Sequence, residues 1–223
     1  MTLLLAAWLA LVVGGSEAAA QRPTHPVTGR AIADVMSHLG ADWLDRSERE
    51  REEAPSKAVA ALAVRPGDVV ADIGAGSGYY TALLSKAVGP GGRVYSTDIQ
   101  PEMLALLQTR LRRERITNVV PVLATATDPR LPEAALDLAL MVDVYHELSQ
   151  PQVTMRALRK TLKPGGRLVL IEFRHGDPRV PIREEHTMRV ETARRELEAD
   201  GYRLDRVIDV LPWQHILVFV PAV

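Results

Sequence analysis

Histidine and glutamate side chains follow several apolar segments in the second half of the sequence. Five of them are candidates for catalysis: His146, Glu147, Glu172, His186 and His215. Imidazole and carboxyl groups accept and release protons near neutral pH, and they also orient a bound substrate through hydrogen bonds. We therefore predict that His146 or Glu147 acts as a general base or orients a bound substrate, with the other candidates nearby.

The same residues also have structural interpretations. Tyr145-His146-Glu147 suits the cap of a following helix, and His186 suits an exposed loop. Histidine and glutamate are metal ligands as well. However, the sequence contains no H-x-x-x-H or H-E-x-x-H spacing, and we predict no metal.

A glycine-rich segment indicates a nucleoside-binding site. Gly74, Gly76 and Gly78 follow an apolar run that ends with Asp72 and Ile73. Glycines allow a tight turn and let a ligand approach the backbone, and the helix that follows presents free N–H groups. The spacing is G-x-G-x-G, whereas dinucleotide-binding loops carry G-x-G-x-x-G. Because the Asp72 carboxylate would repel a pyrophosphate, the segment favours a positively charged cofactor.

Asp98 provides a second fixed point, twenty positions after Gly78 and directly after the next apolar segment. A carboxylate at this place can accept hydrogen bonds from both hydroxyls of an adenosine ribose. Ile99 follows and offers an apolar surface for adenine. The alternative is that Asp98 caps the helix that begins near Pro101.

Strands that alternate with helices would position these residues. We predict strands at 68–73, 93–97, 119–123, 135–142, 167–173, 203–210 and 216–220, most of them separated by helices. This alternation requires a parallel sheet with helices on both faces. Only residues 211–215 separate the last two strands, so these form an antiparallel hairpin. The predicted fold is α/β, a doubly wound, mostly parallel seven-stranded sheet, and such sheets bind ligands at the carboxyl ends of their strands.

Several motifs resemble those of class I S-adenosylmethionine-dependent methyltransferases, which have a Rossmann-like fold. The run from Asp72 to Gly78 resembles their first motif, and Asp98 resembles their ribose-binding acidic residue. Residues 127–132, 136–138 and 163–168 resemble their later motifs, in the family's order. The resemblance covers residues 55–220. It implies S-adenosylmethionine as cofactor, with Asp143 at its amino acid end and Asp128 at its adenine.

The composition fits one soluble domain. The chain has 223 residues and a formal net charge of −1, so it offers no electrostatic reason to bind nucleic acid. It contains no cysteine, which excludes disulfides and thiolate chemistry. The highly charged run at 45–53 is typical of an exposed helix face.

The first residues are typical of an export signal. An apolar run from Leu3 to Val13 precedes Ala18-Ala19-Ala20, although no lysine or arginine comes before it. We therefore expect residues 1–20 to be a signal peptide or an anchor, residues 21–54 a linker and helical lid, and residues 55–223 the methyltransferase domain. We therefore expect a periplasmic or secreted protein that has no membrane span once the leader is removed. The alternatives are a cytoplasmic protein or one anchored in the membrane by its N-terminus. The chain is similar to a poorly characterised bacterial group with such a leader.

Together these features predict an enzyme that transfers a methyl group from S-adenosylmethionine to a small-molecule or protein acceptor. The acceptor is not readable from the sequence. The alternatives are a non-catalytic binding protein with the same fold and, third, a nicotinamide-dependent oxidoreductase.

Overall fold

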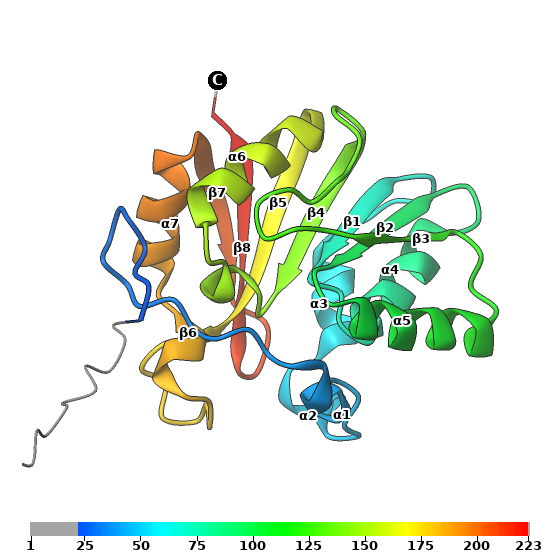
Figure 1. The fold of residues 1–223 in the computed structure, drawn as a ribbon, viewed down its shortest axis with the longest axis horizontal. Coiled ribbons are helices and arrows are strands. Elements are labelled where there is room, and N and C mark those ends of the chain that lie inside the picture. The colour runs from blue at the N-terminus through cyan, green and yellow to red at the C-terminus, as the bar shows by residue number, and fades with distance from the viewer. Residues whose placement is uncertain (1–21, 223) are drawn as a thin grey trace, which may run out of the picture.

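The computed structural model describes residues 22–222, and the predicted leader lies outside the described residues. The fold is α/β, and a single β-sheet forms the centre of the molecule (Figure 1). Its strands are β1 (Val69–Ile73), β2 (Arg93–Asp98), β3 (Val119–Leu123), β4 (Leu136–Val142), β5 (Leu162–Arg174), β6 (Thr187–Met188), β7 (Tyr202–Ile208) and β8 (Gln214–Pro221). The main path runs in the order β3-β2-β1-β4-β5-β8-β7. The seven predicted strands are confirmed, and the sheet contains an eighth, short strand, β6, which pairs with β5 outside this path.

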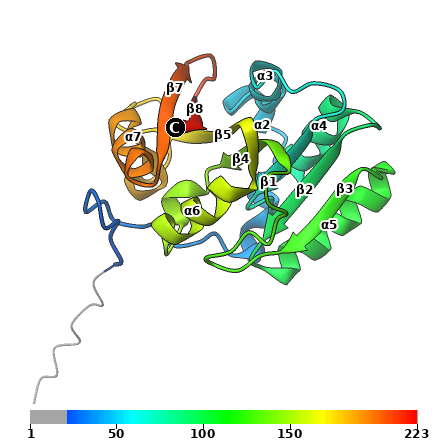
Figure 2. The same ribbon diagram turned by 90° about the horizontal axis from the view of Figure 1, so that it is seen from above.

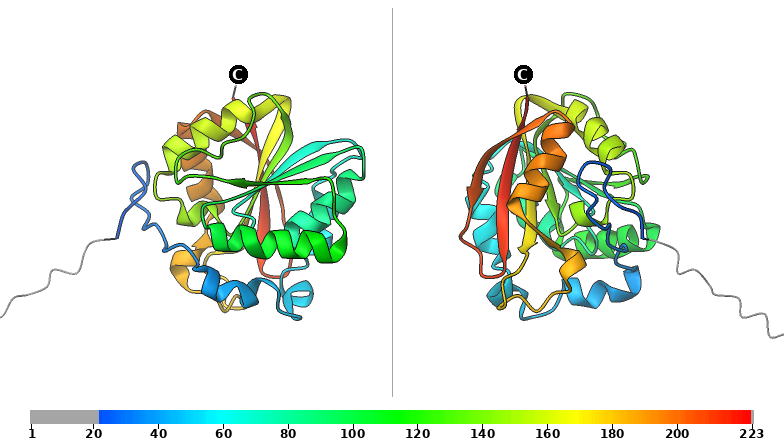
Figure 3. Two further views of the ribbon diagram at one scale, coloured as in Figure 1. Left: turned by 45° about the vertical axis from the view of Figure 1, so that its right-hand side comes forward. Right: turned by 90° about the vertical axis from the view of Figure 1, so that its left-hand side faces the viewer.

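The direction of each strand also agrees with the prediction. The five strands β1 to β5 pair in parallel, whereas β8 lies antiparallel to both β5 and β7. Figure 3 shows this reversed hairpin at one edge of the molecule. The carboxyl ends of β1, β2, β4 and β5 therefore meet at one edge of the sheet, as the parallel arrangement requires.

Two local features differ from the prediction. Residues 187–188 form the short strand β6, which was not among the predicted strands and pairs with the end of β5; the last helix begins after it, at Val190. Strand β5 begins at Leu162, but its pairing with β4 shifts between Leu136 and Leu138. Residues 163–166, which include a proline and two glycines, leave the regular register there, and regular pairing resumes at Arg167, where the strand was predicted to begin.

Helices cover both faces of the sheet. They are α3 (Pro55–Ala61), α4 (Tyr79–Val88), α5 (Pro101–Glu114), α6 (Pro151–Thr161) and α7 (Val190–Ala199). Three of them have proline in the first turn, where the missing N–H costs no hydrogen bond. Figure 2 shows α6 and α7 on one side of the sheet and α3 and α4 on the other.

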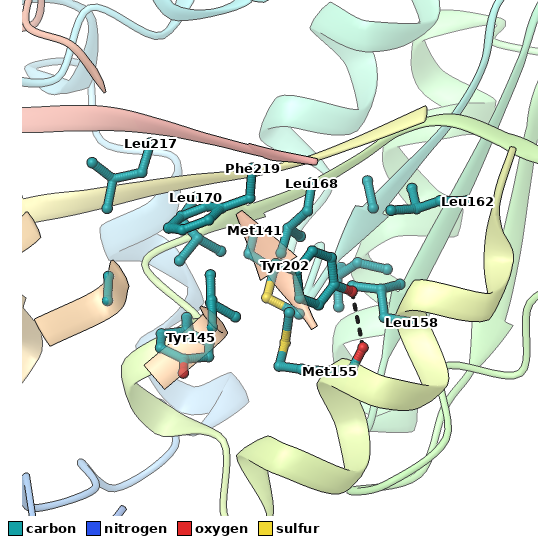
Figure 4. Packing of buried hydrophobic residues seen from close by; sticks show 14 of the residues in the cluster. Met141, Tyr145, Met155, Leu158, Leu162, Leu168, Leu170, Tyr202, Leu217 and Phe219 are labelled. Carbon is teal, nitrogen blue, oxygen red and sulfur yellow. Dashed lines mark hydrogen bonds between the residues drawn. The ribbon is translucent and has the colours of Figure 1, made fainter. Parts of the chain in front are cut away.

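The core lies in two layers because side chains of a strand alternate between the faces. In β4, Ala139 and Met141 pack toward α6 and α7, whereas Leu138 and Leu140 pack toward α3 and α4. Figure 4 shows the first of these layers, where the Tyr202 hydroxyl donates a hydrogen bond to the Met155 carbonyl at 2.9 Å. This burial on both faces fixes β4, and so fixes the residues that follow its carboxyl end.

The N-terminal arm, residues 22–54, crosses the carboxyl edge of the sheet (Figure 1). It contains α1 (Ala41–Leu44) and α2 (Arg49–Glu52). The buried Glu196 of α7 anchors its first part, because Glu196 accepts a hydrogen bond from Arg30 Nη2 at 3.0 Å and contacts Thr28. Within residues 22–222, no helix combines the length and the apolar character needed to cross a membrane.

Candidate functional site

A cavity of about 720 Å³ lies between the carboxyl edge of the sheet and the N-terminal arm. This volume is within the range of small-molecule sites. Eight of the predicted site residues line it: Gly74, Gly76, Asp98, Ile99, Asp143, His146, Glu147 and His186. The cavity therefore connects the glycine-rich segment with the histidine cluster, which are far apart in the sequence.

The glycine-rich segment turns tightly from β1 into α4. Gly74, Gly76 and Gly78 have φ angles of 68°, 55° and 85°, in the left-handed region that side chains disfavour. A Cβ atom at Gly74 would lie 2.6 Å from Val144 Cγ2, and one at Gly78 would lie 2.4 Å from Leu107 Cδ1. Both positions need glycine for the turn and for close packing. Gly78 does not line the cavity and serves the packing of α4 against α5.

Asp98 lies at the end of β2 and faces the glycine segment. One carboxylate oxygen accepts the N–H of Gly76 at 3.0 Å, and the other accepts the N–H of Gln100 at 2.9 Å. Burial raises the pKa of Asp98. Since each oxygen can accept a second hydrogen bond, the carboxylate retains the capacity to bind two ligand hydroxyls.

Asp72 lies under the segment rather than in the cavity wall. Its side chain accepts a hydrogen bond from Thr81 Oγ1 at 2.6 Å, and Thr81 also contacts Ser96 Oγ at 2.9 Å. Asp72 is 2% exposed, and this burial raises its pKa to about 6. Its ionised form therefore destabilises the cofactor-free protein.

We expect Asp72→Asn to increase the free energy of unfolding at pH 8. The pKa of Asp72 is about 6 when folded and 3.8 in the reference state, so the folded protein binds the extra proton between these values. The free energy of unfolding of the wild type therefore falls as the pH rises through this window, by about 3 kcal/mol from this group. The amide remains neutral throughout. Urea denaturation of both proteins at pH 3.5 and pH 8 measures the difference.

The exposed Asp34 provides the control substitution, Asp34→Asn, which should change the stability little at either pH. An equal effect of Asp72→Asn at both pH values would contradict the explanation.

Asp143 follows β4 with a φ angle of 54°. One of its carboxylate oxygens accepts a hydrogen bond from Gln214 Nε2 at 2.7 Å. The other oxygen is buried and has no hydrogen-bond partner within residues 22–222. Burial raises the pKa of Asp143 well above its usual value. A cationic group in the cavity would stabilise the ionised form of this carboxyl group.

A carboxylate–imidazole pair forms the other end of the cavity. His146 Nδ1 lies 2.6 Å from Glu172 Oε2, and both side chains are buried. Glu172 Oε1 also accepts the N–H of Tyr145 at 3.1 Å. These contacts orient the imidazole so that Nδ1 donates to Glu172 and Nε2 remains for other partners.

Two further groups surround Nε2 of His146. His186 Nδ1 lies 3.1 Å from it and Glu147 Oε1 lies 3.9 Å from it. Burial lowers the pKa of His146, but the Glu172 and Glu147 carboxylates outweigh burial and raise it. Burial raises the pKa of Glu147 to about 7. Two imidazoles and one carboxyl group thus meet at one point of the cavity.

The remaining predicted residues lie outside the cavity wall. Glu172 is behind His146, and His215 of β8 pairs in register with Glu172. His215 is 6% exposed, and its Nε2 has no hydrogen-bond partner within residues 22–222. Asp128 is exposed and accepts the N–H of Arg130 at 2.8 Å. In this segment Thr125, rather than Asp128, lines the cavity.

Sequence reasoning missed two residues of the arm. The prediction of an exposed face at 45–53 is wrong for Arg49 and Glu53, which are 5% and 1% exposed and line the cavity. Arg49 Nε donates to Glu53 Oε2 at 2.8 Å, and the guanidinium lies 4.7 Å from the centre of the Tyr79 ring. The aromatic pair Tyr79-Tyr80, placed directly after the glycines, was the available signal for a cation packed above them.

Comparisons with known proteins agree with this geometry. Residues 71–170 match the family described as "Methyltransferase domain". A protein-L-isoaspartate O-methyltransferase of Methanothrix thermoacetophila is 30% identical over 132 residues, 59% of this chain and 60% of that protein. The ubiquinone/menaquinone biosynthesis C-methyltransferase UbiE of Burkholderia multivorans is 35% identical over 116 residues, 52% of this chain and 47% of that protein. The chain spans about half the length of the curated relatives that it matches.

A solved structure extends the likeness over the whole fold. A SAM-dependent methyltransferase from Aquifex aeolicus superposes with a TM-score of 0.79 at 26% identity, over 83% of this chain and 98% of that one. The description of that protein names S-adenosylmethionine as its methyl donor, in agreement with the cofactor that the motifs of this chain imply. The likeness and the motifs therefore identify the fold as that of the class I S-adenosylmethionine-dependent methyltransferases, and residues 71–170 match the methyltransferase domain family.

Proposed function

We propose that this protein transfers a methyl group from S-adenosylmethionine to a small acceptor, or to a protein side chain, bound next to His146. The observation that carries the proposal is the continuity of the cavity, which joins Asp98 at one end to His146 and Glu147 at the other. A methyl donor and its acceptor must meet in one space that excludes water. The cavity provides one continuous space for both.

The residues present fit the cofactor. Asp98 would hold the ribose hydroxyls, Ile99 would lie against adenine, and the backbone at Gly74 and Gly76 leaves room for the rest of the molecule. The free buried oxygen of Asp143 suits the ammonium group of the amino acid part. When bound, the cofactor supplies an activated methyl group, and the protein then has to align the acceptor and manage its proton.

The acceptor end combines polar and apolar groups. His146, Glu147 and His186 would contact the nucleophilic atom of the acceptor, since they are the titratable groups of this end. Met36, Phe173 and Ile182 line the cavity nearby and would cover an apolar part of the acceptor. The relatives' names refer to isoaspartyl protein and to quinone biosynthesis, which illustrates the range of acceptors on this scaffold.

Isothermal titration tests the cofactor part of the proposal. We expect S-adenosylhomocysteine to bind at one site per chain and NADH to give no heat of binding, because Asp72 and the G-x-G-x-G spacing disfavour a pyrophosphate. Binding of NADH without binding of S-adenosylhomocysteine would support the oxidoreductase alternative. Binding of the cofactor with no transfer to any acceptor would favour a non-catalytic role.

A further inference from the structure

We propose that His146, Glu147 and His186 bind a divalent transition-metal ion at the acceptor end of the cavity. Each residue offers one ligand atom, and these atoms all lie within 4.8 Å of one another. Two imidazoles and one carboxylate are a ligand set that zinc and iron(II) sites share. The set does not form a local sequence motif, because His186 is forty positions away from His146.

The distances between the three ligand atoms fit a metal centre. His146 Nε2 and His186 Nδ1 are 3.1 Å apart, and Glu147 Oε1 lies 3.9 Å from the first and 3.7 Å from the second. In a triangle with these sides, the point equidistant from the corners lies about 2.1 Å from each, which is the length of a zinc–nitrogen or zinc–oxygen bond. Three ligand atoms at these distances could therefore bind one ion at ordinary bond lengths.

The surroundings of His146 also match those of a metal ligand. Histidines that bind metals almost always donate their second N–H to a carboxylate or carbonyl, which fixes the ring and its tautomer. Here His146 Nδ1 lies 2.6 Å from Glu172 Oε2. This contact directs the lone pair of Nε2 toward the proposed centre. Glu172 would thus be a positioning residue.

The surrounding backbone also positions the other two proposed ligands. Glu147 Oε2 accepts the N–H of Met36 at 3.4 Å, which leaves Oε1 free toward the histidines. His186 ends a short 3-10 helix (Glu184–His186) that leads into β6, and β6 pairs with the end of β5. The cluster is therefore assembled by the sheet edge and the arm together.

The site would be open on the cavity side, since all three ligands line the cavity. Three protein ligands and an open position are typical of a catalytic centre rather than a structural one. An acceptor with an oxygen or nitrogen donor atom would occupy that position, where the cation would lower the pKa of its proton. This last step rests on the proposed function, whereas the binding of the ion does not.

Cobalt(II) is the probe that tests the site. Protein treated with a chelator and then titrated with Co²⁺ should develop visible absorption at one ion per chain, and Zn²⁺ should abolish it. Glu147→Gln and His186→Ala should each weaken the binding at least tenfold. Glu172→Gln should weaken it by about 10- to 100-fold, as second-sphere substitutions do. His175→Ala is the matched control, because His175 contacts Thr187 beside the cluster without belonging to it.

The outcomes separate this proposal from the proposed function. Wild-type protein that binds Co²⁺ no better than His186→Ala would overturn the metal site and would show that the two imidazoles share only a hydrogen bond. Because titration with S-adenosylhomocysteine is a separate measurement, cofactor binding without cobalt binding refutes only the metal site. Cobalt binding without cofactor binding refutes only the methyltransferase.

Discussion

Replacement of Asp98 by alanine is expected to weaken the binding of S-adenosylhomocysteine by at least about 100-fold. Two hydrogen bonds from ribose hydroxyls to a charged carboxylate contribute about 1.5–3 kcal/mol each, and 1.4 kcal/mol corresponds to a factor of ten in affinity. The substitution also removes the acceptor of the Gly76 N–H, which holds the glycine segment against β2. Isothermal titration measures the loss.

Asp128→Ala is the matched control. Its carboxylate is exposed and outside the cavity wall, so the affinity should remain close to that of the wild type. A large loss in Asp128→Ala would instead support the adenine contact that the family resemblance implies. Asp98→Asn should fall between alanine and the wild type, since the amide oxygen still accepts hydrogen bonds. Unchanged affinity in Asp98→Ala would refute the assignment of this pocket.

Removal of Nε2 of His146 is expected to reduce methyl transfer by about 100-fold or more, the usual contribution of a positioned acid or base. The same loss is expected if Nε2 holds the proposed metal ion, and the cobalt titration separates the two roles. Asparagine is the informative replacement, because its amide N–H can still donate to Glu172, which is fully buried. Alanine would leave that carboxylate unpaired and destabilise the fold. His146→Asn should therefore bind S-adenosylhomocysteine like the wild type and yet transfer little methyl.

The measurement uses labelled S-adenosylmethionine and a panel of phenols, quinols and isoaspartyl peptides, the acceptor chemistries suggested by the relatives. His215→Asn serves as the comparison, since His215 is buried beside Glu172 but does not line the cavity. An equal loss of methyl transfer in both variants would indicate that the substitutions act only by destabilising the protein. Full activity in His146→Asn would exclude it from the transfer step.

The regular part of the fold was predictable from local patterns. Strand β4 is apolar at nearly every position, as a strand covered on both faces must be, and the short 211–215 connection forces the reversed hairpin. Strand β6 was not predictable, because two residues carry no periodicity and its pairing depends on β5.

The candidate site was predictable to the level of the sheet edge. His146, Glu147 and His186 follow strand or loop ends that the topology brings together, so their position could be inferred. The inward direction of Arg49 and Glu53 could not be inferred from the charged run itself, because its only signal, the pair Tyr79-Tyr80, lies in a distant segment. The position of His215 beside Glu172 could not be inferred either, since it depends on the register between β5 and β8.

The cavity is built from two sources, and this has a consequence for evolution. Its cofactor end lies within the segment 71–170 that matches the methyltransferase family, whereas the arm and His186 lie outside that segment. Loops and appended segments diverge faster than the scaffold that carries them. Exchange of the arm and of the 175–188 connection would therefore change the acceptor end of the cavity in related proteins. The residues at the cofactor end would stay the same.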